Sequence, residues 1–178
     1  QGESGCHGGF DRTQATGGGR CLTDHRASQV HHRDRGETQL PAERHHTVSV
    51  LIGAHVAPAF KVALDMLTRT SKIDDIAPDV SVFPRAPHPV TGGRQLEQLA
   101  FEIVSTESMS HATTKAAKLA GRGVRRVFAI DIVRQRVLEW SRELTNWAVL
   151  DAVSRIEDPA LSVSLLVGAL LETVDADD

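Results

Sequence analysis

The stretch between residues 99 and 132 most constrains what this chain can fold into. It consists of an apolar strand over 99–105, a helix over 110–120 and a second apolar strand over 127–132. Strand, helix and strand in this order form a crossover that returns the chain to the same sheet. The order predicts an α/β fold whose crossover lies between Ser105 and Val127.

The remaining elements fit around this crossover. Period-2 alternation predicts a strand over 79–83, and the Pro- and Gly-rich residues 84–95 predict a loop. We also expect a partly helical segment over 48–64 that Pro58 interrupts, a short strand over 65–70, a hairpin over 136–141 and 146–150, and an amphipathic helix over 162–174.

The density of apolar residues changes near residue 47. Residues 1–46 hold 8 of the 14 Gly, 6 of the 9 His and both Cys, and their large apolar side chains are isolated. Such a segment cannot bury enough surface to offset its chain entropy. We expect a disordered or poorly packed tail over 1–46, one domain over 47–174 and an acidic tail over 175–178.

Histidine and cysteine in the first segment raise the question of a metal site. The pairs His31–His32 and His45–His46 could bind metal, as could Cys6–His7 with Cys21 and His25. Their spacings match no closed zinc module, so a solvated tail is the favoured interpretation.

Composition excludes several classes of protein. The formal net charge of −3 and pI of about 6.3 exclude a globally basic nucleic-acid coat, although a local basic patch is compatible with them. No apolar run approaches the length of a membrane span, and the start does not resemble a signal peptide. Two cysteines exclude a disulfide scaffold and favour a cytoplasmic protein without membrane partners.

Glu102 is the most informative residue, because its neighbours in the strand are apolar. Alternation places it on the face of Ala100 and Val104. A carboxylate buried there needs a cation, a strong donor or a proton. The alternative is an edge strand whose Glu102 faces solvent.

Asp79 offers a second carboxylate at the start of a strand, directly after Pro78. If strands 79–83 and 99–105 are neighbours, Asp79 and Glu102 can converge. Paired carboxylates suit Mg²⁺ or Mn²⁺. A turn residue after proline is the plainer interpretation of Asp79.

A basic helix face follows the second strand. Four residues recur at helical spacing: His111, Lys115, Lys118 and Arg122. From Lys115 to Arg142 there are eight Lys or Arg against two acidic residues. The face is either a solvated helix surface or a wall that binds phosphate beside a metal site.

Taken together, these segments resemble a known family. Pro78-Asp79, Glu102-Ile103-Val104-Ser105, the helix Lys115 and the strand Gly123–Asp131 follow the ordered pattern of the Uma-type branch of the PD-(D/E)XK nuclease superfamily. The resemblance covers about residues 48–174. It implies a restriction-endonuclease-like mixed sheet flanked by helices and an endonuclease that hydrolyses DNA phosphodiester bonds with Mg²⁺ or Mn²⁺.

The resemblance also implies roles for individual residues. Asp79, Glu102 and Lys115 would be catalytic, with Asp79, Glu102 and the Ile103 carbonyl as metal ligands. His111, Lys118 and Arg122 would bind phosphate. Lys115 would replace the Lys that the superfamily usually carries where this chain has Val104. A homodimer is a candidate assembly for cutting both strands.

The chain departs from the family pattern at two places, which keeps other functions open. His111 stands where the family often has Asp, and the acid expected from an N-terminal helix has only Glu43 and Asp65 as candidates. Asp131 is expected to be structural, capping the next turn. The alternatives are an inactive nuclease fold that binds DNA or a protein partner, and an interaction domain in which Lys115 and Glu102 lie far apart.

Overall fold

The computed structural model describes residues 36–105 and 109–175, so the expectations for Cys6, His7, Cys21, His25 and His31–His32 lie outside it. The helices of this part are α1 (Gly36–His55), α2 (Met109–Arg122) and α3 (Val167–Asp175). Its main sheet has the order β1 (Phe60–Leu64), β4 (Val80–Pro84), β5 (Leu99–Val104), β6 (Arg126–Asp131), β7 (Arg136–Ser141) and β8 (Asn146–Leu150). Two smaller hairpins pair β2 (Thr68–Arg69) with β3 (Asp75–Ile76) and β9 (Arg155–Ile156) with β10 (Leu165–Leu166). None of the described helices has both the length and the apolar character of a membrane span.

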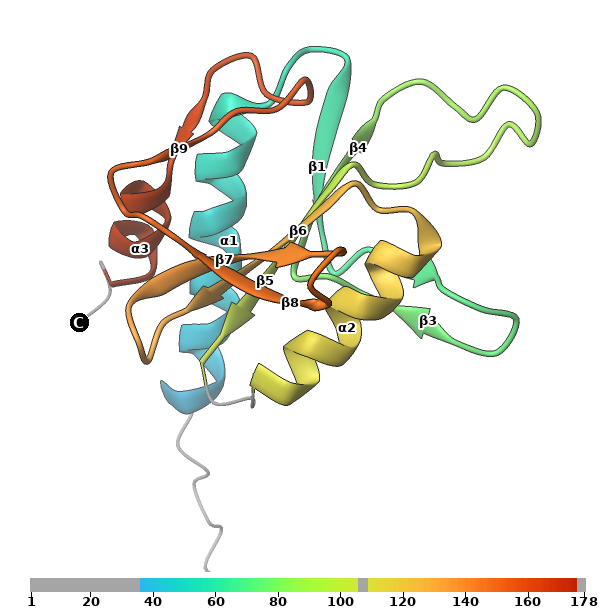
Figure 1. Ribbon diagram of the computed structural model, residues 1–178. Coiled ribbons are helices and arrows are strands. Elements are labelled where there is room, and N and C mark those ends of the chain that lie inside the picture. The colour runs from blue at the N-terminus through green and yellow to red at the C-terminus, as the bar shows by residue number, and fades with distance from the viewer. Residues whose placement is uncertain (1–35, 106–108, 176–178) are drawn as a thin grey trace, which may run out of the picture. The chain divides into compact units, whose positions relative to one another are not determined.

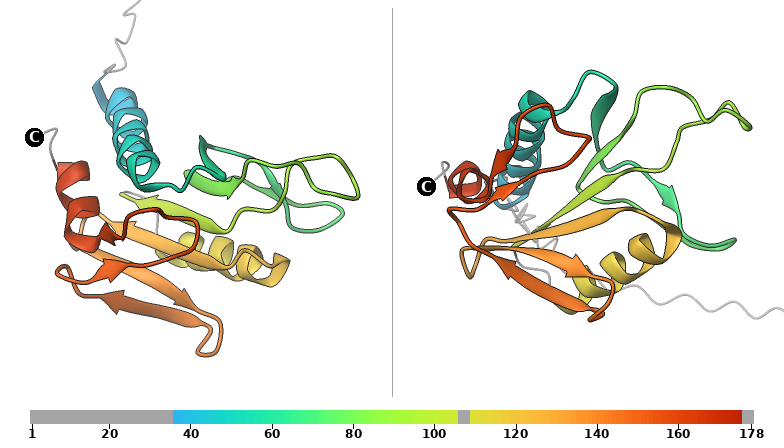
Figure 2. Two further views of the ribbon diagram at one scale, coloured as in Figure 1. Left: turned by 90° about the horizontal axis from the view of Figure 1, so that it is seen from above. Right: turned by 45° about the horizontal axis from the view of Figure 1, so that its top comes forward.

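The central strands of the main sheet are covered by helices on both faces (Figure 1). Val82, Phe101 and Phe128 pack against α1 and α3 on one face, while Ala100 and Val127 pack against α2 on the other. Figure 2 shows α1 and α3 side by side, away from α2. Strand alternation explains this division, because successive side chains point to opposite faces.

The predicted crossover is confirmed. Strands β5 and β6 are parallel and joined through α2, with Glu102 paired with Ala129. The other neighbours in the main sheet are antiparallel, including β4 and β5, which the loop 84–95 connects as expected. The result is the mixed α/β sheet flanked by helices that the sequence predicts.

Helix α1 spans the boundary that the sequence predicts between the tail and the domain. It runs across residue 46, where the sequence predicts the change from tail to domain, and ends at His55, three residues before Pro58. Val48 and Ile52 are fully buried and anchor the helix to the sheet. Proline fixes φ and lacks an amide hydrogen, which explains why a turn and then β1 follow.

The expected helix over 162–174 is wrong in its first part. Leu165 and Leu166 pair with Ile156 and Arg155 as strand β10, and α3 begins only at Val167. The Arg155 guanidinium also donates to the Ser164 hydroxyl at 2.7 Å. The apolar spacing fits either structure, so the cross-strand partner, distant in sequence, decides between them.

Candidate metal centre and adjoining cleft

Three acidic residues are neighbours across three adjacent strands: Asp65 directly after β1, Asp79 directly before β4 and Glu102 within β5. Leu64 pairs with Val80, and Val80 pairs with Phe101, so the next residues in register are Asp65, Asp79 and Glu102. The Asp65 amide donates to the Asp79 carbonyl at 3.3 Å, which continues the ladder by one step. The sheet register therefore brings together acids that are far apart in the sequence.

Asp79 is the central carboxylate of this row, and its side chain is only 16% exposed. The Ile103 amide donates to Asp79 Oδ2 at 2.6 Å and fixes the orientation of the carboxylate. Burial raises the pKa of Asp79, and the Asp65 carboxylate adds to the rise. The Ile103 hydrogen bond and the nearby side chains of His45 and Lys115 lower the pKa of Asp79 and so act in the opposite direction.

His45 joins the site from α1. Its Nε2 lies 3.9 Å from Asp79 Oδ2, and ligand atoms of His45, Asp65 and Asp79 all lie within 4.8 Å of one another. His45, Val48 and Ile52 share one helix face at spacings of three and seven residues. Because Val48 and Ile52 are buried against the sheet, the same face directs His45 toward the strand ends.

Asp65 has an unusual backbone for its residue type, with a φ of 47°. Only a few per cent of non-glycine residues adopt a positive φ, although Asp tolerates it better than most. Strained backbone of this kind tends to occur at functional sites. The conformation lies directly after β1, where the chain turns away from the sheet.

Glu102 forms an ion pair with Lys115, which supplies the cation that this buried acid requires. The Lys115 ammonium contacts Glu102 Oε2, and the two side chains are 15% and 4% exposed. Lys115 belongs to the inner side of α2, where Ala112, Ala116 and Leu119 are buried. Glu102 therefore faces α2, as alternation predicts, and does not belong to the group formed by His45, Asp65 and Asp79.

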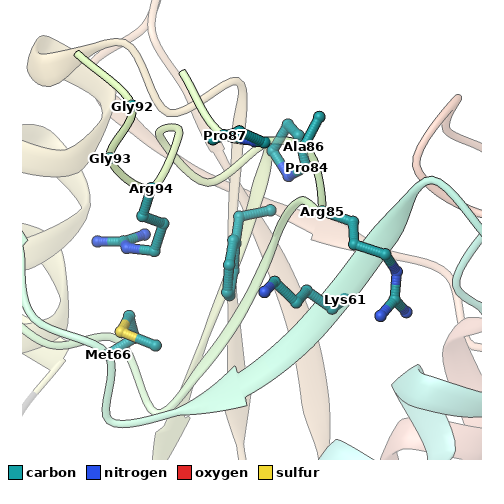
Figure 3. Close-up of a pocket in the computed structure, with 10 residues that line it drawn as sticks. Lys61, Met66, Pro84, Arg85, Ala86, Pro87, Gly92, Gly93 and Arg94 are labelled. Atoms are coloured by element: carbon teal, nitrogen blue, oxygen red, sulfur yellow. The ribbon is translucent and has the colours of Figure 1, made fainter. Parts of the chain in front are cut away.

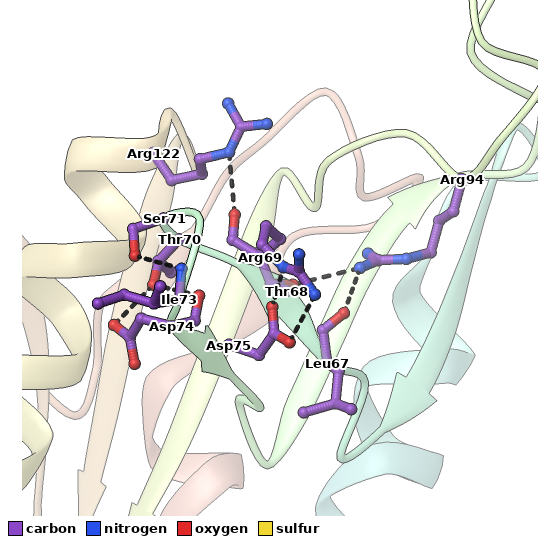
Figure 4. Close-up of polar contacts among 10 residues, drawn as sticks. All are labelled: Leu67, Thr68, Arg69, Thr70, Ser71, Ile73, Asp74, Asp75, Arg94 and Arg122. Atoms are coloured by element: carbon purple, nitrogen blue, oxygen red, sulfur yellow. Dashed lines mark hydrogen bonds and ion pairs between the residues drawn. The ribbon is translucent and has the colours of Figure 1, made fainter.

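The other predicted site residues are divided between the cleft and a hairpin. His111, Lys115 and Lys118 line a cavity of about 340 Å³ whose opposite wall is residues 74–77. Lys118 pairs with Asp74 at 2.9 Å. Arg122 lies outside this cavity and donates to the Arg69 carbonyl at 3.0 Å (Figure 4). Lys118 and Arg122 thus hold the β2–β3 hairpin against α2.

Figure 4 shows the polar contacts that hold this hairpin in place. Arg69 forms an ion pair with Asp75 at 2.5 Å, and the Thr70 hydroxyl donates to Asp74 Oδ2 at 2.9 Å. Arg94 donates to the Leu67 carbonyl at 2.8 Å from the other side. The hairpin is therefore a fixed wall of the cleft that Lys115 and Lys118 line.

Three further sequence expectations can be compared with the structure. Ile103 contributes its amide to Asp79, as described above, and its carbonyl remains the expected metal ligand. Asp131 is fully buried, pairs with Arg136 at 3.1 Å and accepts the Arg134 amide at 3.2 Å, so the structural role expected for it is confirmed. Glu43 is an exposed residue of α1.

Sequence reasoning missed His45 as a site residue and treated Asp65 only as a candidate acid. The signal for His45 was present as the pair His45–His46, but the pair was assigned to the tail. The spacing of His45, Val48 and Ile52 would have placed it on the buried face of a helix.

Comparison with known proteins finds a likeness in fold. The fold matches a solved structure from Anabaena variabilis ATCC 29413, described as "a putative nuclease belonging to DUF820", with a TM-score of 0.59 and 20% identity. The match covers 74% of this chain and 82% of the other. No protein-family model matches the chain, and no curated protein matches it. The likeness confirms the resemblance at the level of the fold.

Proposed function

We propose that this protein is an endonuclease that uses Mg²⁺ or Mn²⁺ to hydrolyse DNA phosphodiester bonds. The observation that carries the proposal is the row of Asp65, Asp79 and Glu102 across three strands. His45 of α1 lies beside Asp79, and Lys115 of α2 contacts Glu102. A fold shared with a protein described as a nuclease supports the same class of reaction.

The donor set near Asp79 fits a divalent cation. Carboxylate oxygens suit Mg²⁺ and Mn²⁺, and an imidazole nitrogen extends the range toward transition metals. A partly buried carboxylate with a raised pKa is stabilised when a cation approaches it. Asp79, Asp65 and His45 would hold the ion, with Glu102 and the Ile103 carbonyl as the further ligands implied by the family resemblance.

The side chains around the ion have separate tasks. A bound divalent cation supplies a water of lowered pKa and polarises a phosphoryl oxygen. The Ile103 amide holds Asp79 in one orientation. Lys115, held by Glu102, donates to phosphate oxygens as negative charge grows on them. His111 and Lys118 line the adjoining cleft and would bind phosphate groups there. Arg122 lies outside the cleft on the same helix and would bind phosphate beside it.

Of the two alternative functions, one is contradicted by an ion pair and the other is favoured by one residue. An interaction domain without a nucleic-acid role required Lys115 and Glu102 to lie far apart, and their ion pair contradicts that requirement. A nuclease fold that binds DNA or a protein without cleaving DNA is favoured by His111 in a position where the family often has Asp. Salt-sensitive DNA binding without cleavage would distinguish this second function.

The direct test is cleavage of supercoiled plasmid with Mg²⁺ or Mn²⁺. We expect nicking that EDTA stops and that Asp79→Ala, Glu102→Ala and Lys115→Ala abolish. Glu172→Ala, which changes an exposed acid on α3, is the matched control and should cleave normally. Cleavage that persists in Asp79→Ala or in EDTA would exclude this site. Light scattering of the DNA-bound protein would test the homodimer.

A further inference from the structure

A second pocket lies at the end of β1 and β4 that is opposite to Asp65 and Asp79. It has a volume of about 290 Å³ and is lined by Met66, Phe83, residues 84–87 and residues 92–94, together with Lys61. Of the described residues that line it, three are cations, namely Lys61, Arg85 and Arg94, and none is an acid (Figure 3). The composition of the wall favours an anionic ligand.

The floor of the pocket is an aromatic ring with a cation beside it on two sides. Lys61 Nζ lies 5.4 Å from the Phe83 ring centroid, and the Arg94 guanidinium carbon lies 5.2 Å from it. Figure 3 shows Lys61 and Arg94 on opposite sides of the pocket, with the Lys61 ammonium turned toward its interior. Attraction to the ring holds both cations without neutralising them.

The three cations differ in how far their charge is balanced. Arg94 pairs at 3.1 Å with Glu97, which is fully buried. Arg85 donates to the carbonyls of Pro58 and Phe60, at 3.3 and 3.2 Å. Among the described residues neither Lys61 nor Arg85 has an acidic partner, so the pocket keeps a net positive charge.

The loop that closes the pocket is built by its own hydrogen bonds. The His88 ring Nδ1 accepts the Val90 and Thr91 amides at 3.2 and 3.3 Å. The His88 amide donates to the Gly93 carbonyl at 2.7 Å, and Gly92 has a φ of 67°, which favours glycine. The wall is therefore preorganised, which lowers the entropic cost of binding.

The pocket faces the same side of the sheet as the carboxylates. Alternation along β4 puts Phe83 on the face of Asp79, and Lys61 is the cross-strand partner of Phe83. Phe83 is four positions along the strand from Asp79, a distance of about 13 Å. At 3.4 Å per base pair this distance corresponds to about four base pairs of a duplex.

We propose that this pocket binds a backbone phosphate of the nucleic acid, about four base pairs from the bond held at the carboxylates. The inference rests on the proposed nuclease function, because it assumes that a nucleic acid lies along this face. Lys61 supplies the principal contact with the phosphate, and Arg94 and Arg85 make the electrostatic potential around it more positive. Phosphate contacts of this kind fix the register of a duplex without reading its sequence.

The test measures DNA binding by fluorescence anisotropy in EDTA, so that the duplex stays uncut, between about 50 and 300 mM salt. We expect Lys61→Gln to reduce the slope of log Kobs against log salt by about 0.9, the value for one lost phosphate contact. Lys61→Arg should keep the wild-type slope. Arg155→Gln removes an exposed cation from β9 and should also leave the slope unchanged.

The outcomes separate this inference from the function on which it rests. A wild type without salt-dependent DNA binding would overturn both. A wild-type slope in folded Lys61→Gln would overturn the phosphate pocket and leave the nuclease proposal intact. Titration with inorganic phosphate, followed by NMR at the Gly92 and Gly93 amides, identifies a site for a free anion. Such shifts with an unchanged DNA slope would also overturn the proposal.

Discussion

Replacing Lys115 with methionine removes the cation that the buried Glu102 carboxylate contacts. The two side chains are 15% and 4% exposed, so water cannot replace the lost partner well. Breaking a buried pair from one side costs about 3–5 kcal/mol, since a charge remains in a medium that solvates it poorly. In a domain of this size each kcal/mol lowers Tm by about 2–4 °C, so we expect a fall of roughly 6–20 °C.

Thermal unfolding followed by circular dichroism measures this effect. Lys72→Met is the matched control, because Lys72 is an exposed residue between β2 and β3, and it should change Tm little. The double variant Glu102→Gln/Lys115→Met should recover much of the loss, because the buried Glu102 charge is removed together with Lys115. Mn²⁺ should stabilise Lys115→Met more than the wild type if a cation can reach Glu102.

Two results would refute this reasoning. A Lys115→Met protein as stable as Lys72→Met would mean that the pair is solvated and contributes little. A double variant no more stable than Lys115→Met would mean that the cost comes from lost packing of the lysine stem rather than from the Glu102 charge that has lost Lys115.

Three other perturbations test the site and its support. Asp79→Asn should raise Tm at neutral pH, because burial disfavours the ionised carboxyl. Since burial raises the pKa of Asp79 in the folded protein, the gain in Tm should shrink as pH falls toward the ordinary pKa of 3.8. A gain in Tm that does not change with pH would contradict this cause. His45→Ala should weaken Mn²⁺ binding by at least roughly tenfold in calorimetric titration, and more than it weakens Mg²⁺ binding, because imidazole is the softer donor. Ile52→Ala should cost about 2–5 kcal/mol in urea unfolding, whereas Val50→Ala on the exposed side of α1 should cost far less.

The crossover and the need for a cation beside Glu102 could be predicted because both follow from local patterns. Period-2 alternation fixes which face Glu102 occupies, and helical spacing brings Lys115 to the inner side of α2. A charge among apolar neighbours requires a partner whatever the remaining topology is. The sequence could not decide whether that partner was a side chain or a metal ion.

The contribution of His45 could not be predicted in the same way. Its segment is poor in large apolar residues, and composition alone favoured a tail. What holds the end of α1 in place is the packing of Val48 and Ile52 against β4 and β5, far along the chain. The buried Glu97 is a similar case, because its partner Thr68 is 29 residues away. Contacts of this range override local composition.

Register is the property that links the fold to the proposed chemistry. Asp65, Asp79 and Glu102 are neighbours in register only because β1, β4 and β5 align Leu64 with Val80 and Val80 with Phe101. A slip of one residue in β4 would turn Asp79 to the opposite face and expose Val80 and Val82, which are now fully buried. The apolar core that penalises such a slip therefore also holds the carboxylates together. Stability of the sheet and geometry of the candidate metal centre depend on the same residues.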